Sequence, residues 1–289
     1  MRFGFKIPHQ AITWTRLADV WRVGDDLDVF ESAWTYDHLV ALRAVEGGID
    51  IAPATPMLDG WSLLAALAAI TQRLRIGNLV SCVPFRHPVV LTKIATTVDE
   101  ISGGRLELGL GAGWMEPEAA MYGTELGSLR DRLVRLEEAL EVILGLLTSE
   151  TFDYDGRFYR LSGARVEPKV QRPRPPIWLG GNGEKRTLRL VARYADAWNY
   201  TALRPGGELD AFRAKCDVLR ERCVEIGRDP SDVLITAQLP LGDGPAQLAE
   251  SASAWGDAGA SYIIVMLPAG AEPGLLEQLA VALGPLRDA

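Results

Sequence analysis

Short apolar runs alternate with longer amphipathic runs along the whole sequence, and this alternation repeats eight times. It is typical of parallel strands covered by helices. The expected strands cover residues 2–7, 31–36, 75–80, 106–110, 177–179, 197–200, 234–238 and 262–267. The expected helices cover residues 16–23, 62–71, 89–101, 129–147, 184–194, 209–226, 246–258 and 274–286. Eight such units nearly fill 289 residues, so we predict an α/β fold, a single (β/α)₈ TIM barrel domain over residues 1–289.

Three longer segments interrupt the alternation. Residues 37–60 and 111–127 are expected to be irregular, and both follow the carboxyl end of a predicted strand, where barrel active sites are built. Residues 152–176 begin with aromatic and β-branched residues around Asp155 and Gly156, which indicates a small hairpin at the bottom or side. The first two segments are therefore where we look for a functional site.

The charge and cysteine content exclude several classes of protein. Thirty Lys and Arg stand against 38 Asp and Glu, and no basic cluster exceeds two residues, so nucleic acid and membrane surfaces are not expected partners. Cys82, Cys216 and Cys223 lack CxxC spacing, so no disulfide or metal site is expected. No apolar run approaches ~20 residues. We predict a cytoplasmic protein that acts on a small molecule.

Glycines gather after the fourth predicted strand, in the segment RLELGLGAGW. Gly109, Gly111 and Gly113 do not form a dinucleotide fingerprint, because Trp114 stands where that motif requires glycine. One interpretation is that the backbone passes close to a flat ligand there. The alternative is tight packing at the strand end.

A second glycine cluster lies between the fifth strand and its helix. Gly180, Gly181, Asn182 and Gly183 would leave backbone amides free at a helix N-terminus, which is a common phosphate site. The alternative is a strand–helix junction that only needs small residues. Together the two clusters suggest a phosphorylated cofactor with an extended planar part.

Polar and aromatic residues at strand ends supply the remaining candidates. His38 follows Asp37 at the end of the second strand and is the predicted proton donor or cofactor contact. His9 is a weaker candidate for the wall of the substrate pocket, and His87 is expected to cap a helix. The tryptophans that could line a pocket are Trp14, Trp34, Trp61, Trp114 and Trp198, with core packing the alternative for Trp61 and Trp198.

Three segments carry a resemblance to a known family: SAWTYDHL, RLRIGNLVSCVPFRHPVVLTKIATTVDEISGGRLELGLGAGW and PPIWLGGNGEKRTLRLVARYADAWN. With these the chain resembles the bacterial luciferase-like superfamily, in particular its coenzyme F420-dependent branch, over essentially its full length. The resemblance implies a barrel that holds a flavin or the deazaflavin F420 at the carboxyl ends of its strands.

The resemblance also assigns roles to single residues. It makes His38 the catalytic residue, as proton donor or polar contact near the reactive ring carbon, and implies a non-proline cis peptide between Leu79 and Val80, against the cofactor ring. The residues that it places at the cofactor are Asp37, Leu79, Val80, Cys82, Ala112 and Gly113 around the ring and Gly180, Gly181, Gly183 and Glu184 around the phosphate. Trp114 departs from the acidic residue of F420-dependent glucose-6-phosphate dehydrogenases, which disfavours sugar-phosphate oxidation. Glu116 or Glu118 could approach the same space.

These implications lead to two hypotheses about function. The first is an F420-dependent oxidoreductase that transfers a hydride between the deazaflavin and a small organic substrate. The alternative is an FMN-dependent monooxygenase supplied with reduced flavin by a separate reductase, and cofactor binding without turnover is a third possibility. Lys185, Arg186 and Arg86 would form a cationic rim for F420. We expect a neutral, hydrophobic substrate beside His9, Trp14 and Trp114, and a homodimer.

Overall fold

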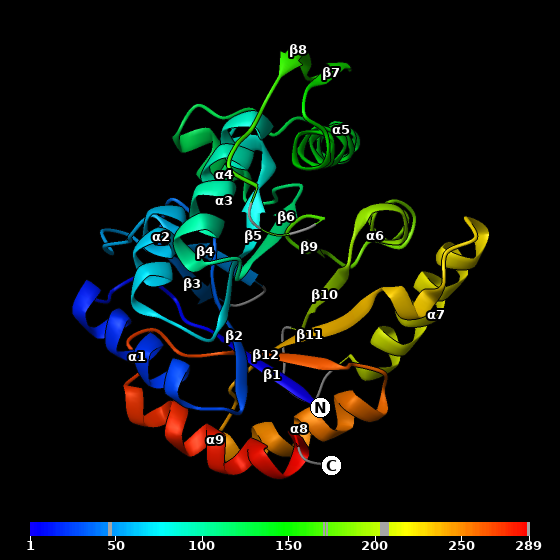
Figure 1. Ribbon diagram of the computed structural model, residues 1–289. Helices are drawn as coiled ribbons and strands as arrows, with labels where there is room; N and C mark the ends of the chain where they lie inside the picture. The colour runs from blue at the N-terminus through cyan, green and yellow to red at the C-terminus, as the bar shows by residue number, and fades with distance from the viewer. Residues whose placement is uncertain (46–47, 170, 172, 203–207, 288–289) are drawn as a thin grey trace.

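In the computed structural model, which describes residues 1–45, 48–169, 171, 173–202 and 208–287, eight parallel strands close into a barrel (Figure 1). Their spatial order is β1, β12, β11, β10, β9, β6, β5 and β2. The strands are β1 (Arg2–Lys6), β2 (Phe30–Thr35), β5 (Arg75–Cys82), β6 (Leu106–Gly111), β9 (Ile177–Gly180), β10 (Ala197–Thr201), β11 (Leu234–Pro240) and β12 (Tyr262–Met266). The predicted (β/α)₈ barrel is confirmed.

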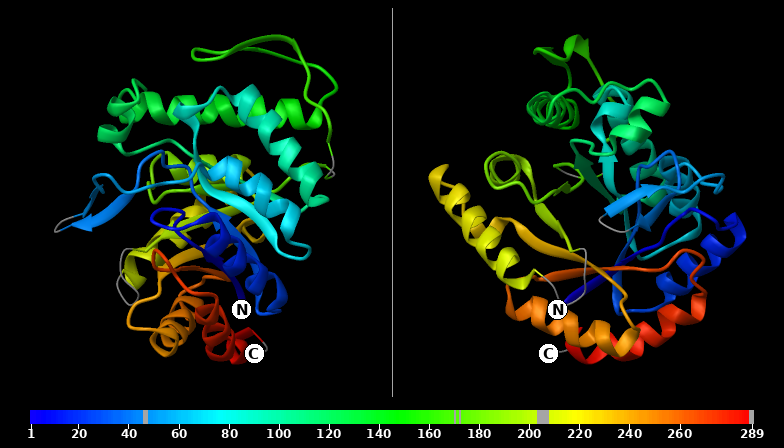
Figure 2. Two further views of the ribbon diagram at one scale, coloured as in Figure 1. Left: turned by 90° about the vertical axis from the view of Figure 1, so that its left-hand side faces the viewer. Right: turned by 180° about the vertical axis from the view of Figure 1, so that it is seen from behind.

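Helices cover the outside of the barrel, as the views from the side and from behind show (Figure 2). They are α1 (Trp14–Asp26), α2 (Gly60–Ile70), α3 (Pro88–Ser102), α5 (Leu129–Thr148), α6 (Thr187–Tyr194), α7 (Leu209–Glu225), α8 (Pro245–Asp257) and α9 (Pro273–Arg287). Most predicted bounds agree within three residues, and α6 begins three residues after the predicted start at Glu184. That every residue from 1 to 289 belongs to one domain stays a prediction.

Side-chain caps explain where several helices begin. Thr13, Asp59 and Ser128 each accept a hydrogen bond from the backbone amide three residues later, at the starts of α1, α2 and α5. His87 caps α3, since its Nδ1 accepts from the amide of Val89 at 3.3 Å. The predicted capping role of His87 is therefore confirmed.

The barrel interior is filled by aromatic side chains. The ring centroids of Trp34 and Trp178 lie 4.6 Å apart, and Tyr262 packs edge-on against Trp178 at 5.9 Å. The Trp34 indole and the Tyr262 hydroxyl both donate to the Ser32 hydroxyl, at 2.7 and 2.5 Å. A side chain at Gly77 would collide with the Trp34 ring. Trp34 is thus part of the core, and its predicted place on a pocket wall was wrong.

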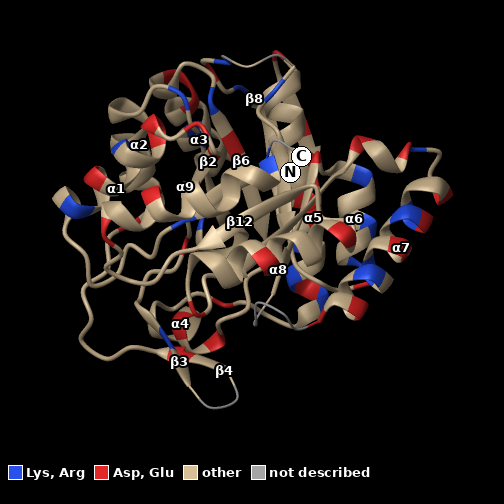
Figure 3. Cartoon of the chain, turned by 90° about the horizontal axis from the view of Figure 1, so that it is seen from below, with Lys and Arg blue, Asp and Glu red and all other residues tan. Residues whose placement is uncertain are grey.

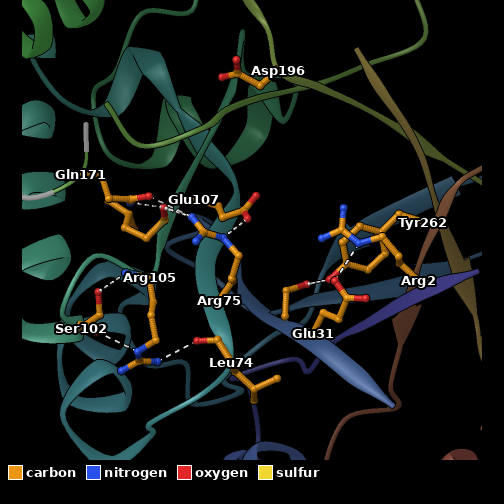
Figure 4. A network of polar contacts seen from close by, with 12 residues as sticks. Arg2, Glu31, Leu74, Arg75, Ser102, Arg105, Glu107, Gln171, Asp196 and Tyr262 are labelled. Carbon is orange, nitrogen blue, oxygen red and sulfur yellow. Dashed lines mark hydrogen bonds and ion pairs between the residues drawn. The ribbon is translucent and has the colours of Figure 1, made fainter. Parts of the chain in front are cut away.

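Charged side chains are paired at the amino-terminal ends of the strands (Figure 4). Arg75 forms an ion pair with the buried carboxylate of Glu107 and donates to Gln171 at 3.1 Å. Arg105 donates to the Leu74 carbonyl at 2.7 Å, which ties α3 to β5. These contacts close the bottom of the barrel with polar groups that have partners.

Two of the segments that were expected to be irregular contain secondary structure. Residues 37–60 include an antiparallel pair, β3 (Leu42–Val45) and β4 (Gly48–Ile51), and residues 111–127 include α4 (Glu116–Met121). The side chain of Gln10 accepts from the Leu42 amide and donates to its carbonyl, at 2.8 and 2.7 Å, and so holds β3 near β1. These tertiary bonds have no local sequence signal.

The predicted hairpin is present as β7 (Phe152–Asp155) and β8 (Arg160–Ala164). It lies beside α5, because Phe152 occupies the space above Gly145 and Glu138 accepts from the amides of the hairpin turn. Cys216 and Cys223 are buried on α7, which confirms their predicted packing role.

Acidic and basic residues are mixed over the outer helices (Figure 3). In the described part of the chain, no helix combines the length and apolarity that a membrane span requires. The same residues contain no group of three His, Cys, Asp or Glu side chains placed to hold a metal ion.

Candidate functional site

His38 and Glu118 form the central polar contact at the carboxyl ends of the strands. The Nδ1 atom of His38 lies 2.6 Å from Oε2 of Glu118, whose side chain is 1% exposed. The other carboxylate oxygen accepts from the amides of Leu39 and Val40, at 2.5 and 3.3 Å. Because a carboxylate only accepts, this contact places a hydrogen on Nδ1, and Nε2 has no partner among the described residues.

The sequence singled out His38 and indicated Glu118, with Glu116, only as an acidic residue that could approach the space beside Trp114. The two residues are 80 positions apart, and α4 brings them together. A carboxylate in the first turn of a short helix with a proline as its second residue was the available signal. Glu116, on the same helix, points elsewhere and pairs with Arg132 at 3.3 Å.

Asp37 is anchored inside the protein. Both of its carboxylate oxygens accept from Arg86, at 2.7 and 2.6 Å, and one accepts from the Cys82 amide at 2.9 Å. Burial raises the pKa of Asp37 to about 6, and the nearby guanidinium of Arg86 opposes that shift. Asp37 thus fixes the end of β2 to the turn after β5, while its role as a cofactor contact stays a prediction.

The contacts of Asp37 also bear on Arg86, which was expected to form part of a cationic rim for F420. Its guanidinium faces Asp37 and also reaches Asp59 at 3.3 Å. A side chain held between two carboxylates is not available for a cofactor tail. The prediction that Arg86 belongs to the cationic rim was therefore wrong. Lys185 and Arg186 are exposed.

Cys82 lies between the two acidic residues. Burial raises the pKa of its thiol well above the ordinary range, and the charges of Asp37 and Glu118 add to the shift. The thiol is therefore protonated and unreactive at neutral pH. A Cβ atom on Gly113 would come within 3.0 Å of the Cys82 sulfur, so Cys82 and Gly113 lie side by side.

The peptide bond between Leu79 and Val80 is cis, as predicted. The side chain of Val80 faces Gly111 of β6 and Gly180 of β9. A Cβ atom on Gly111 would collide with it, and one on Gly180 would lie 3.1 Å from it. Gly109 has a similar neighbour, since a Cβ there would overlap the Asn78 carbonyl. These glycines make room for protein atoms, so the tight-packing alternative applies to them.

Ala112 and Gly113 continue from β6 toward α4. Gly113 has a φ angle of +80°, which favours glycine, and Ala112 is partly buried against the core. Their predicted contact with a cofactor ring stays a prediction.

The glycine segment after β9 is open. Gly181 donates to the Asn199 carbonyl at 3.4 Å, and its own carbonyl accepts from the Trp198 indole at 2.9 Å. From Asn182 to Arg186 no backbone amide has an acceptor among the described residues, and the buried Oδ1 of Asn182 also lacks a partner. This row of free donors fits a phosphate group.

Two features of this segment differ from the expectation. Residues 184–186 form a turn, because the Gly183 carbonyl already accepts from the Leu188 amide before regular helix begins at Thr187. Glu184 is exposed and pairs with Lys215 at 2.9 Å. The backbone amides, and not an ideal helix terminus, are therefore the donors of the candidate phosphate site.

The three residues expected at the substrate have different environments. His9 is 1% exposed, its ring lies 4.3 Å from the Tyr36 ring, and its Nδ1 has no partner in the described structure. Trp14 is 40% exposed at the start of α1, and Trp114 is 52% exposed. The Trp114 ring meets the His38 ring edge-on at 5.5 Å. Trp114 is thus directly beside the candidate catalytic histidine.

One charged side chain at this face was not singled out from the sequence. Lys6, the last residue of β1, is partly buried and donates to the Leu79 carbonyl and to Gln238. A lysine in the apolar strand RFGFKI was the available signal, because a charge there interrupts an otherwise hydrophobic run.

The chain is similar to both F420 and flavin enzymes. It is 31% identical over 166 residues to the F420-dependent glucose-6-phosphate dehydrogenase of Amycolatopsis mediterranei, covering 57% of this chain and 46% of that protein. It is 29% identical over 163 residues to the FMNH(2)-dependent dimethylsulfone monooxygenase of Pseudomonas putida, covering 56% and 43%. The matched segments thus span about half the length of the curated relatives.

Solved structures extend the similarity of fold to the whole chain. The structure of an F420-dependent secondary alcohol dehydrogenase in complex with an F420–acetone adduct superposes with a TM-score of 0.84 at 15% identity and covers 99% of both chains. The model of the luciferase-like monooxygenase family matches residues 1–277. The chain therefore belongs to the luciferase-like monooxygenase family.

Proposed function

We propose that this protein is an F420-dependent oxidoreductase that transfers a hydride between the deazaflavin and a small organic substrate. The observation that carries the proposal is the row of free amides from Asn182 to Arg186, in which Lys185 and Arg186 are exposed cations. A phosphodiester with an anionic tail matches these donors and charges. The similarity to F420-dependent enzymes supports the same choice.

The residues around His38 have distinct tasks in this proposal. The bound deazaflavin supplies the hydride chemistry. Glu118 fixes the His38 ring through Nδ1, so that Nε2 can hold or release a proton at the reacting face. Trp114 covers one side of that ring and limits access of water. Val80, Ala112 and Gly113 form the surface on which we place the cofactor ring.

An FMN-dependent monooxygenase is the second candidate. The similarity to the dimethylsulfone monooxygenase favours it, and a free-amide row also fits the single phosphate of FMN. Such an enzyme would consume oxygen and depend on a separate reductase, which the first candidate would not.

Anaerobic single-turnover experiments separate the two candidates. The protein is mixed with reduced F420 and a panel of aldehydes, ketones and unsaturated carbonyl compounds, and the absorbance of oxidised F420 is followed. We expect its formation without oxygen, with a loss of about 100-fold in His38→Ala. His87→Ala removes a histidine that caps α3 and packs on Tyr159 rather than on His38; it is the matched control and should retain the rate.

Two outcomes contradict the proposal. One is no oxidation of F420 with any compound while reduced FMN supports oxygen-dependent product formation. The other is a His38→Ala variant that keeps the parent rate.

A further inference from the structure

Lys6 occupies an unusual position at the carboxyl end of β1. Its Nζ lies 2.9 Å from the Leu79 carbonyl and 3.2 Å from Oε1 of Gln238, and the Tyr36 ring centroid is 5.1 Å away. All these neighbours belong to strand ends or to residues just after them, so the ammonium lies at the same face as His38.

The ammonium has donors to spare. It carries three N–H groups, and the Leu79 carbonyl and Gln238 accept two of them. Gln238 is held in this orientation, because its Nε2 donates to the sulfur of Met266 at 2.9 Å. Among the described residues no carboxylate lies within 4.0 Å of Nζ. The third N–H therefore has no hydrogen-bond acceptor among the described residues, and the Tyr36 ring is its only other recorded contact there.

The other four lysines of the chain differ from Lys6. Lys169 and Lys215 pair with carboxylates, Lys93 donates to the Glu167 carbonyl, and Lys185 is exposed on the glycine segment. A partly buried cation without a counter-ion is costly, so its position is better explained by a ligand that brings the negative charge.

We infer that Lys6, oriented by Gln238, is a binding site for a carboxylate of the substrate. The rings of Tyr36, His38 and Trp114 flank this face and suit the apolar body of such a molecule. The inference rests on the proposed function for the reaction itself, and it replaces the neutral substrate expected from the sequence with an apolar acid.

The test measures binding without the cofactor. Benzoate and benzamide serve as a matched pair of probes, and calorimetry gives their affinities at pH 7. We expect the wild-type protein to bind benzoate at least about tenfold more tightly than benzamide, since one charge–charge contact separates the two. Lys6→Met should reduce the ratio to within about twofold. Lys6→Arg should keep the preference, and so should the control Lys93→Met on the exposed side of α3.

A pH series gives a second readout. Burial lowers the pKa of Lys6 from 10.5 to about 8, so the cation is present below that pH and is lost above it. The neighbouring titratable groups are Tyr36, whose pKa burial raises beyond the range of the experiment, and His9, whose pKa burial lowers below 6.5. The preference for benzoate should therefore decline as the pH rises through about 8.

Three results overturn the inference: equal affinity for both probes in the wild type, an undiminished preference in folded Lys6→Met, or a preference that stays constant from pH 7 to 10. The last applies even if Lys6→Met fails to fold. Titration of F420 with the same proteins keeps the proposed function separate, because loss of carboxylate binding with normal F420 binding contradicts only the role of Lys6.

Discussion

The two ends of the barrel differ in whether their charged and polar groups have partners within the protein. At the amino-terminal end, Arg75 and Glu107 satisfy each other and Arg2 pairs with Glu31 (Figure 4). At the carboxyl-terminal end, the third N–H of Lys6 and the backbone amides from Asn182 to Arg186 lack acceptors within the described chain. A partly buried cation without a counter-ion reduces stability, and free backbone amides can bind an anion, so we infer that this end binds ligands and the other maintains the fold.

The largest effect on stability is expected at the amino-terminal end. Arg75→Met leaves the Glu107 carboxylate buried without its partner, which should lower the free energy of unfolding by about 2–3 kcal/mol. Urea unfolding measures this loss. Arg2→Met is the control, because its pair with Glu31 is exposed and should contribute less than about 1 kcal/mol. F420 affinity that drops in Arg75→Met at full stability would contradict the division between the ends.

At the other end, Glu118→Gln should impair turnover more than folding. The amide can still accept from the backbone of Leu39, but its NH₂ group would donate to Nδ1 of His38 and place the ring hydrogen on Nε2. We expect a loss of about 10-fold to 100-fold in rate. The ¹⁵N chemical shifts of His38 report the change of tautomer.

The matched control for that change is Glu116→Gln on the same helix, where the carboxylate is 71% exposed. It should keep both the rate and the His38 tautomer. An unchanged tautomer in Glu118→Gln would mean that the carboxylate does not orient His38.

A smaller effect is expected in the glycine segment. Asn182→Asp places a negative charge beside the free amides without changing the side-chain shape, and it should weaken F420 binding about tenfold. Gln278→Glu adds the same charge on the exposed surface of α9 and should have no effect. Equal F420 affinities in the two variants would contradict the placement of the cofactor phosphate at this segment.

Removing the exposed cations should have the smallest effect. The double variant Lys185→Gln, Arg186→Gln should weaken F420 binding by about twofold to fivefold at low salt, and the difference should disappear at high salt because exposed charges are screened. Fluorescence titration at several salt concentrations measures it. A difference that salt does not change would point to direct hydrogen bonds.

The sequence allowed the barrel to be predicted because strands and helices each have their own hydrophobic period, and it located His38 and the Gly180–Gly183 segment at strand ends. The partners of these residues could not be read in the same way. Glu118 meets His38 only through the position of α4, and Arg86 turns toward Asp37 because a buried carboxylate requires a counter-ion. Such choices depend on tertiary distances.

The sequence alone also did not distinguish glycines with two different roles. Gly109, Gly111 and Gly180 look like a ligand-binding motif, but the atoms closest to them belong to Asn78 and Val80. In the Asn182–Arg186 segment the neighbouring space contains no acceptor from the described residues. The three-dimensional structure is needed to tell a glycine that makes room for another part of the protein from a backbone segment that can bind a ligand.

The most direct test of the account is a parallel titration of the purified protein with F420 and FMN, followed by fluorescence at low and high salt. The account predicts that F420 binds at least about tenfold more tightly than FMN at low salt, and that salt reduces this ratio, because only F420 carries an anionic tail beside Lys185 and Arg186. Tighter binding of FMN at all salt concentrations would contradict the account and favour the monooxygenase.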